Sequence, residues 1–218
     1  MSRWLTLPVV AFLLLPAAGS RPAAAQQLQP IALPAPQKTG GMPLMQALDA
    51  RHSSREFSPK PLPLQTLSNL LWAGFGVNRQ DGRRTAPSAM NWQEIDIYVF
   101  LAEGVYVYQA RENMLKPVVP GDLRSLTGTQ AFTATAPLGL VYIGDMSRTS
   151  RASAEQVAIW SPSHAGFIAQ NVYLFCASEG LNVVVRGLID KQALADKLEL
   201  RPEQKVWLAQ TVGYPAGK

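Results

Sequence analysis

A short polar and basic run, RHSSREF, occupies residues 51–57. Arg51, His52 and Arg55 supply several hydrogen-bond donors, and Ser53 adds a compact hydroxyl beside them. A guanidinium fork can bind a phosphate or a ring carbonyl through paired hydrogen bonds. The same composition is also typical of a solvated helix end, where cations interact favourably with the helix dipole. Taken alone, the run is compatible with either role.

A second candidate lies in PSAMNWQEIDIYVF, residues 87–100, where a Pro-Ser turn places Asn91 just before a predicted strand. A carboxamide carries both a donor and an acceptor, so it can bind a ring edge that presents both. The alternative is that Asn91 merely ends a turn.

A third candidate is the pair Arg186–Gly187 in EGLNVVVRGLID, residues 179–190. A helix end and a short apolar strand precede the pair, so a bare backbone turn is expected at the end of that strand. Glycine lets another group approach closely, and exposed N–H groups can donate to it. The alternative is an ordinary turn before a helix that Asp190 caps.

The hydrophobic pattern predicts the elements that position these candidates. The helix at 163–179 is apolar over most of its circumference, which favours burial on most sides, and Gly180 ends it. Strands adjoin strands as often as helices, so the α+β class is predicted, with no repeat and no second domain. Helices are predicted at 43–50, 63–73, 163–179 and after Asp190, and strands at 95–101, 105–110, 138–144, 183–185 and 205–213.

The N-terminus has the pattern of a secretory signal peptide. A basic start is followed by an apolar stretch over residues 5–18 and by a small-residue exit at Ala23–Ala25. The apolar stretch is too short for a comfortable bilayer span, although an uncleaved anchor is the alternative. We therefore expect residues 1–25 to be removed near Ala25, giving an exported, periplasmic protein. Residues 26–41 are rich in Pro and Gln and are expected to form an arm or linker before one domain at 42–218.

Composition excludes several classes of function. Residues 1–25 hold Arg3 and Arg21, so 18 of the 20 basic residues remain against 15 acidic ones, a mature net charge of +3. This mild excess has no basic tract and does not indicate a nucleic-acid partner. Cys176 is the only cysteine, so no intrachain disulfide can form. With only two histidines, no metal site is expected.

In this order and spacing, the candidate segments resemble the FMN-dependent nitroreductase family. The resemblance runs from about Pro43 to Pro215, over RHSSREF, PSAMNWQEIDIYVF, the helix HAGFIAQNVYLFCASEGL with its pair Gln170–Asn171, and the closing VGYP. It implies an α+β fold with a mixed β-sheet flanked by helices, in an intertwined homodimer. It also implies that FMN lies at the subunit interface.

The resemblance assigns roles to individual residues. Arg51, His52, Ser53 and Arg55 stand where the family contacts the FMN phosphate, ribityl chain and ring edge. Asn91 matches the family's asparagine against the isoalloxazine.

The Arg186–Gly187 turn matches the backbone that approaches the flavin's hydride-accepting nitrogen. Many relatives carry an acidic residue or glycine in place of Arg186. Its charge is therefore expected to stabilise anionic reduced flavin and raise the potential. Many relatives also continue into an arm with another basic phosphate ligand, and Lys218, Arg83 and Arg84 are candidates for that role here.

The resemblance implies an FMN-dependent oxidoreductase that passes a hydride or two electrons from a reduced donor to a nitroaromatic, quinone or similar acceptor. A ping-pong cycle is expected, with no catalytic side chain, because the flavin carries out the chemistry. The donor is expected to be NAD(P)H or a periplasmic or membrane reductant. Two alternatives share the fold: a non-catalytic flavin carrier, and a peptide-modifying dehydrogenase similar to the azoline oxidases.

Several other residues have structural interpretations. Trp72, Trp92 and Trp160 belong either near the pocket or in the core, and core packing is favoured. Cys176 is predicted to be inert core. His164 is interpreted as a polar residue near a helix start rather than as a base.

Overall fold

The computed structural model describes Met1, residues 27–149 and residues 151–217. The predicted signal segment, apart from Met1, lies outside the described residues. Among the residues described, no helix is both long enough and apolar enough to span a bilayer.

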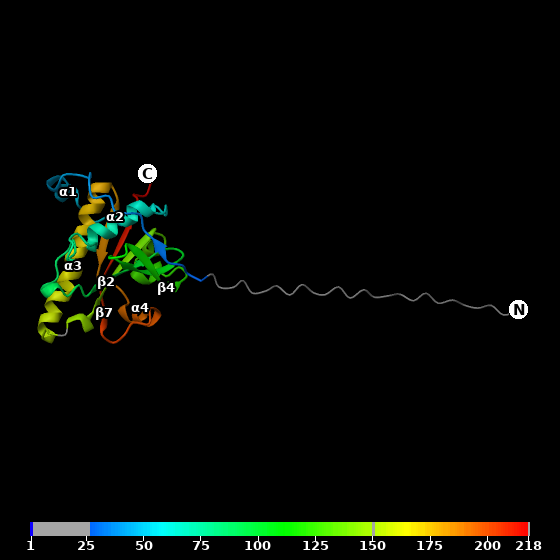
Figure 1. The fold of residues 1–218 in the computed structure, drawn as a ribbon. Helices are drawn as coiled ribbons and strands as arrows, with labels where there is room; N and C mark the ends of the chain where they lie inside the picture. The colour runs from blue at the N-terminus through cyan, green and yellow to red at the C-terminus, as the bar shows by residue number, and fades with distance from the viewer. Residues whose placement is uncertain (2–26, 150, 218) are drawn as a thin grey trace.

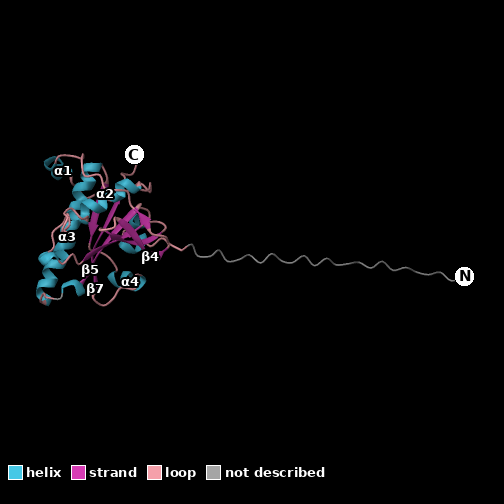
Figure 2. Ribbon diagram, viewed as in Figure 1, coloured by secondary structure: helices cyan, strands magenta, loops and turns pink. Residues whose placement is uncertain are grey.

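A seven-stranded sheet forms the centre of the fold (Figures 1 and 2). Its strand order is β1-β4-β3-β2-β5-β7-β6. The α+β class is confirmed, but the described sheet is antiparallel throughout rather than mixed. The strands are β1 (Ile31–Ala32), β2 (Ile95–Phe100), β3 (Gly104–Gln109), β4 (Met114–Pro120), β5 (Leu138–Asp145), β6 (Asn182–Arg186) and β7 (Gln204–Gly213).

Helices cover both faces of the sheet. On one face, α2 (Leu64–Phe75) and α3 (Ala154–Glu179) pack against each other and onto the strands, and α1 (Leu44–Ala50) packs against α3. On the opposite face, α4 (Lys191–Lys197) packs against β7, and α3 and α4 are well separated in Figure 1. The short 3-10 helices are η1 (Ala89–Asn91), η2 (Arg124–Thr127), η3 (Ala131–Ala134) and η4 (Met146–Thr149).

The main core lies between the sheet and the α2–α3 layer. Leu70 and Leu71 of α2, Ile168 of α3, and Ile97 and Leu140 of the sheet are each at most 2% exposed. Burying a side chain of this size stabilises a fold by roughly 1.5–3 kcal/mol. The core therefore fixes α3 firmly on the sheet. The positions of the polar side chains of α3 are fixed with it.

Helix α3 begins nine residues earlier than the sequence predicts. Proline normally disrupts a helix interior, and the predicted start lies just after Pro162. The structure keeps Pro162 inside α3 and starts the helix with a capping box, in which Ser153 and Gln156 bond to each other's backbone N–H. The predicted end is confirmed, because Gly180 has a left-handed φ of 67°.

The sequence pattern does not predict β4. Pro117 and Pro120 lie within this strand, and proline cannot donate to a sheet ladder. The strand tolerates them because β1 pairs only with Met114 and Leu115, so the rest of β4 lies at the sheet edge.

The described part of the predicted arm packs against the domain. Leu33 is 8% exposed, and its N–H donates to the Asn113 carbonyl at 3.1 Å. Pro34 O accepts from Asn113 Nδ2 at 2.9 Å and from Ser68 Oγ at 2.5 Å. Residues 27–41 are thus held by the β3–β4 connection and by α2.

Candidate functional site

The RHSSREF segment leaves α1 at Arg51 and runs alongside β6. Ser54 N–H donates to Val183 O at 3.0 Å, and Asn182 Nδ2 donates to Glu56 O at 2.6 Å. These bonds fix the backbone of the segment against a strand of the central sheet.

Tyr173 of α3 ties this segment to the end of β6. Its hydroxyl lies 2.7 Å from Ser53 Oγ and accepts the Val185 N–H at 2.9 Å. The guanidinium carbon of Arg51 lies 5.4 Å from the centre of the same ring, within cation–π range. One buried phenol therefore positions a hydroxyl, a guanidinium and the backbone of β6.

Tyr173 is not among the site residues predicted from the sequence. The available signal is its place on the most apolar predicted helix, because a buried tyrosine hydroxyl usually has a hydrogen-bond partner. That signal indicates that the hydroxyl has a partner. It does not indicate that the partner is Ser53, which lies 120 positions away in the chain.

The segment lies at the surface of the molecule. His52, Ser53 and Arg55 are exposed, and Arg51 is partly exposed. Among the described residues, neither Arg51 nor Arg55 forms an ion pair with a carboxylate. This arrangement offers cationic and neutral donors to an anionic group.

Arg186 is placed differently from the expectation that its charge faces a ligand. Its side chain is on the sheet face opposite α3 and only 6% exposed. It donates to Thr127 O at 2.7 Å and to Thr211 Oγ1 at 2.5 Å, and it lies 5.5 Å from the Phe132 ring centre. Burial lowers the pKa of Arg186 to about 10. No carboxylate pairs with it among the described residues.

Two glycines lie next to Arg186, Gly187 in the sequence and Gly128 in space, and they have different roles. Gly187 is exposed, and a Cβ added there would meet nothing within 4 Å, so its backbone is open to a ligand. A Cβ on Gly128 would instead lie 1.9 Å from Nη1 of Arg186. The absence of a side chain at residue 128 leaves room for the guanidinium in its buried position.

Asn91 lies in a turn with unusual backbone geometry. Met90, Asn91 and Gln93 have φ values of 47°, 56° and 49°, in a region where non-glycine residues are uncommon. Asn91 is exposed, and its Oδ1 accepts from Gln93 Nε2 at 2.9 Å. The turn opens directly into β2.

The structure does not bring Asn91 together with the RHSSREF segment. Asn91 precedes β2, the segment lies on β6, and two strands, β5 and β7, separate β2 from β6. Gly187, in contrast, follows β6 directly and so lies near Ser53.

The predicted phosphate rivals surround the Asn91 turn. Arg83 pairs with Asp81 at 2.9 Å on the surface. Arg84 donates to Gln93 Oε1 at 2.9 Å, and its pKa is lowered by burial. Arg83 and Arg84 line a hollow of about 490 Å³ that also includes Asn91, whereas Lys218 lies outside the described residues.

A larger cleft of about 620 Å³ lies between residues 37–41, α2 and α3. Trp72 lines it, and the indole N–H of Trp72 donates to Val77 O at 3.0 Å. None of the seven predicted site residues borders this cleft.

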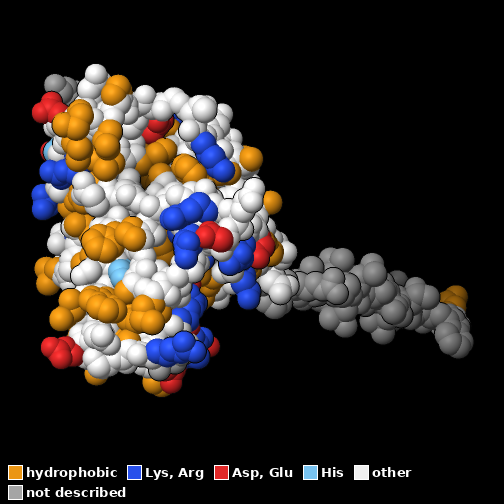
Figure 3. Space-filling view, turned by 60° about the vertical axis from the view of Figure 1, so that its left-hand side comes forward, with side chains coloured by type: hydrophobic (Ala, Val, Ile, Leu, Met, Phe, Trp, Pro, Cys, Tyr) orange, Lys and Arg blue, Asp and Glu red, His pale blue; other side chains and the backbone are white. Residues whose placement is uncertain are grey.

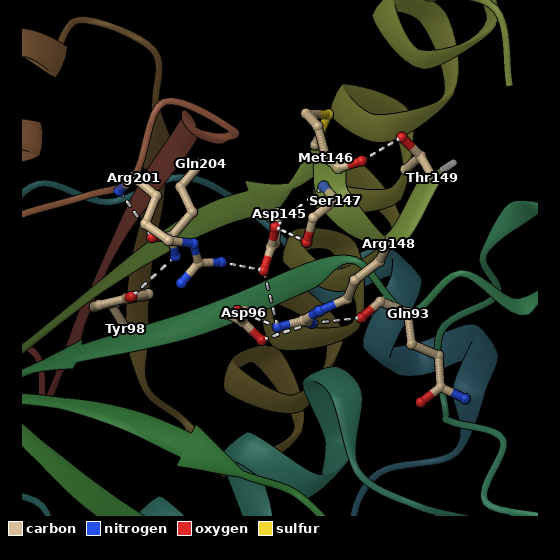
Figure 4. Close-up of polar contacts among 10 residues, drawn as sticks. All are labelled: Gln93, Asp96, Tyr98, Asp145, Met146, Ser147, Arg148, Thr149, Arg201 and Gln204. Carbon is tan, nitrogen blue, oxygen red and sulfur yellow. Dashed lines mark hydrogen bonds and ion pairs between the residues drawn. The ribbon is translucent and has the colours of Figure 1, made fainter. Parts of the chain in front are cut away.

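An ion-pair network holds the outer side of the Asn91 turn (Figure 4). Arg148 donates to both carboxylate oxygens of Asp96, at 3.0 and 2.7 Å, and to the Gln93 carbonyl at 3.0 Å. Asp145 accepts from Arg201 at 2.6 Å and lies 3.6 Å from Arg148.

The pKa values of the two carboxyl groups in this network are shifted in opposite directions. Burial raises the pKa of Asp96 despite its bonds to Arg148. Burial also opposes ionisation of Asp145, but hydrogen bonds from Ser147, the charge of Arg148 and a hydrogen bond from Arg201 outweigh it and lower the pKa.

Two further predictions concern helix α3. Cys176 is fully buried and burial raises the pKa of its thiol, so its interpretation as inert core is confirmed. The interpretation of His164 as a residue near a helix start was wrong. Because α3 begins at Ala154, His164 lies in the middle of the helix, and the residue is 4% exposed. Trp92 and Trp160 pack together nearby, with ring centres 5.6 Å apart.

A family model described as the Nitroreductase family matches residues 48–214. The chain belongs to this family. It is 32% identical over 168 residues to a protein of Methanocaldococcus jannaschii that is provisionally named a nitroreductase, covering 72% of this chain and 85% of the relative.

Solved structures agree with this assignment. A provisionally named nitroreductase from Ralstonia eutropha JMP134 is 43% identical, with a TM-score of 0.84 over 91% of this chain and 95% of that chain. The NADPH:FMN oxidoreductase of Vibrio harveyi, solved with NAD+, shares the fold at 20% identity, with a TM-score of 0.61 over 80% of this chain and 69% of that chain. Family membership identifies the protein as an oxidoreductase.

The bridging role of Tyr173 predicts the effect of removing its hydroxyl. Tyr173→Phe leaves the Val185 N–H without its acceptor, so the free energy of unfolding should fall by about 1–3 kcal/mol. Urea unfolding measures this loss. Tyr98→Phe is the control, because the Tyr98 hydroxyl has only a long 3.4 Å contact with Gln204. Equal losses in the two variants would contradict the bridging role.

The lowered pKa of Asp145 predicts an acid-sensitive contribution to stability. A carboxyl whose folded pKa lies below its ordinary value of 3.8 stabilises the fold above that value and loses this effect as the pH falls through the folded pKa. Asp145→Asn should therefore lower the free energy of unfolding at about pH 7 but flatten its decline below about pH 4. Urea unfolding across this range measures both effects, and an unchanged acid slope would refute the assignment.

Proposed function

We propose that this member of the nitroreductase family is an FMN-dependent oxidoreductase. The observation that carries the proposal is the donor set of Arg51, His52, Ser53 and Arg55, which lies at the surface beside β6 and is held there by Tyr173. The name of the Vibrio harveyi enzyme, an NADPH:FMN oxidoreductase, supports the same cofactor.

The chemistry of the donor set fits FMN. A phosphate is dianionic or nearly so, and it suits guanidinium and hydroxyl donors that no carboxylate already occupies. The exposed backbone of Gly187, near Ser53, suits the close approach of a planar ring. When bound, FMN would supply hydride or two-electron transfer.

The protein's own residues would bind and orient. In this proposal Arg51 and Arg55 hold the anionic end of the cofactor, and Tyr173 keeps Ser53 and Arg51 in place. Arg186 acts differently from the original expectation, because its guanidinium is engaged inside the fold and only the backbone of this pair faces the site.

We also propose a homodimer. Large apolar side chains are exposed on the two helices that pack together on one face, namely Leu44, Met45 and Leu48 of α1 and Ile159 and Phe167 of α3. Figure 3 shows hydrophobic side chains gathered in patches on the molecular side that carries these helices. Exposed apolar patches of this kind mark interaction surfaces. A second subunit would also complete a site whose Asn91 and RHSSREF parts lie apart within one protomer.

The proposed cofactor indicates the classes of substrate. We propose that a reduced donor and then an acceptor, a quinone, nitroaromatic or similar small molecule, use the same site in turn. NAD(P)H or, after export, a periplasmic or membrane reductant would serve as donor.

The FMN assignment predicts a specific loss in one variant. Arg51→Ala should weaken FMN binding about 10–100-fold, because a charge-assisted hydrogen bond contributes about 1.5–3 kcal/mol. The preference for FMN over riboflavin should shrink by the same factor, since riboflavin lacks the phosphate. Fluorescence titration of the purified protein measures both.

Two control variants sharpen this measurement. Arg111→Ala removes an exposed arginine from the β3–β4 connection and should leave FMN binding unchanged. Arg84→Gln tests the rival phosphate ligand, and a larger loss there than in Arg51→Ala would move the phosphate to the Asn91 turn. A folded wild-type protein that binds no FMN would end the proposal. Slow reoxidation of the dithionite-reduced protein, unaffected by quinone or nitroaromatic, would favour the non-catalytic carrier.

The proposed interface predicts that a charge placed on it lowers the mass of the protein particle in solution. Phe167→Asp places a charge on an exposed apolar patch and should convert the dimer into a monomer in light scattering coupled to size exclusion. Leu188→Asp alters a residue that is 65% exposed but lies outside α1 and α3, and it should leave the dimer intact. A monomeric wild-type protein would refute the dimer.

We propose export with cleavage after Ala25. The full chain expressed in a Gram-negative host should appear in the periplasmic fraction, with a mass that begins at Gln26. A full-length chain retained in the membrane fraction would instead establish an anchor.

A further inference from the structure

A buried carboxylate–imidazole pair lies beneath the Asn91 turn. His164 Nδ1 lies 2.7 Å from Glu94 Oε1, and the two side chains are 5% and 0% exposed. A hydrogen-bonded ionisable pair at this depth is costly to bury, so its retention calls for an explanation beyond stability.

The second nitrogen of the imidazole reaches the turn itself. Ala89 N–H donates to His164 Nε2 at 2.9 Å. A backbone N–H can only donate, so Nε2 must accept, and the ring proton lies on Nδ1. Nδ1 then donates to Glu94, which makes a continuous chain from the Ala89 backbone to the carboxyl group.

The surroundings keep this chain largely buried. The Trp92 and Phe167 ring centres each lie 6.1 Å from the imidazole. Among the described residues, Glu94 Oε2 has no hydrogen-bond partner, so His164 is the only side chain that bonds this carboxyl group. Hydrogen bonds between side chains buried to this extent are strong and orient their partners closely.

The turn needs this support because its backbone is strained. Three of its residues, Met90, Asn91 and Gln93, occupy the left-handed region without being glycine. Such conformations persist only when the surroundings hold them, at a cost of order 1–3 kcal/mol each. Ala89 is the first residue of this stretch, so its bond to His164 holds the turn where it begins.

The opposite side of the turn is also held. Gln93 N–H donates to Ser88 Oγ at 3.1 Å, and Arg148 bonds the Gln93 carbonyl (Figure 4). Gln93 Nε2 in turn bonds Asn91 Oδ1. The orientation of the Asn91 carboxamide thus depends on a turn that is fixed at Ala89 from within and at Gln93 from outside.

We propose that Glu94 and His164 are positioning residues that hold the Asn91 carboxamide in place for the cofactor. This inference rests on the proposed FMN function. His164 contacts no ligand in this proposal and exchanges no proton with one; it acts through the Ala89 N–H, and Glu94 acts through the imidazole.

A double-mutant cycle with Asn91 tests the inference. His164→Phe keeps a ring but loses both hydrogen bonds, and it should weaken FMN binding about tenfold, the effect of one lost hydrogen bond. In an Asn91→Ala background, the same change should alter FMN binding by less than about twofold, because the group that His164 positions is gone. An equal loss in both backgrounds, or no loss in either, overturns the proposal.

A matched control separates positioning from general damage to α3. Ser161 lies one turn before His164, is fully buried and accepts a hydrogen bond from Trp207 Nε1 at 2.9 Å. Ser161→Ala should leave FMN binding unchanged, and a loss equal to that of His164→Phe would overturn the proposal. If His164→Phe fails to fold because it strands the Glu94 carboxylate, Glu94→Gln/His164→Phe removes that charge and enters the same cycle.

Hydrogen exchange tests the turn without the cofactor. Amides of residues 89–93 should exchange faster in His164→Phe than in the wild type or in Ser161→Ala, and unchanged exchange overturns the proposal. If the wild-type protein binds no FMN, the proposed function fails, and the exchange result alone decides whether the pair holds the turn.

Discussion

The packing of helix α3 on the antiparallel sheet is the constraint on which the candidate site depends. The apolar side chains of α3 fill the main core, but three of its buried polar side chains reach different strands. Tyr173 reaches β6, Ser161 reaches β7, and His164 reaches the turn before β2. Because these three contacts share one rigid helix, a shift of α3 would disturb the donor segment and the Asn91 turn together.

Sequence reasoning predicts the parts of this arrangement that local patterns determine. Apolar spacing and turn residues predict the α+β class, the β2–β3 hairpin and the Gly180 helix end. Long-range contacts are not encoded locally, so the Ser53–Tyr173 bond was missed, as was the support that His164 gives to Ala89. The early start of α3 and the strand β4 were not predicted, and both contain prolines: tertiary packing overrides the local preference of proline in α3, and a sheet edge tolerates it in β4.

Arg186 illustrates a further limit. Its position at the end of β6 could be predicted, but the face on which its side chain lies could not. Successive strand residues point to opposite faces, so an uncertainty of one residue in register reverses the conclusion. The structure places the backbone of Arg186–Gly187 beside the donor segment while the charge lies among Thr127, Thr211 and Phe132. The backbone of Arg186 and the charge of its side chain therefore lie in different parts of the molecule.

The close approach of Gly128 to Arg186 has a consequence for how this sequence can diverge. A side chain at 128 would overlap the guanidinium where it lies, so a larger residue there requires Arg186 to leave its bonds to Thr127 and Thr211. Loss of the arginine removes the obstacle, and position 128 is then open to variation. Replacing Arg186 before Gly128 therefore avoids this overlap, whereas the reverse order requires the buried guanidinium to move. Substitutions at the two positions, 58 residues apart in the chain, are therefore expected to affect each other.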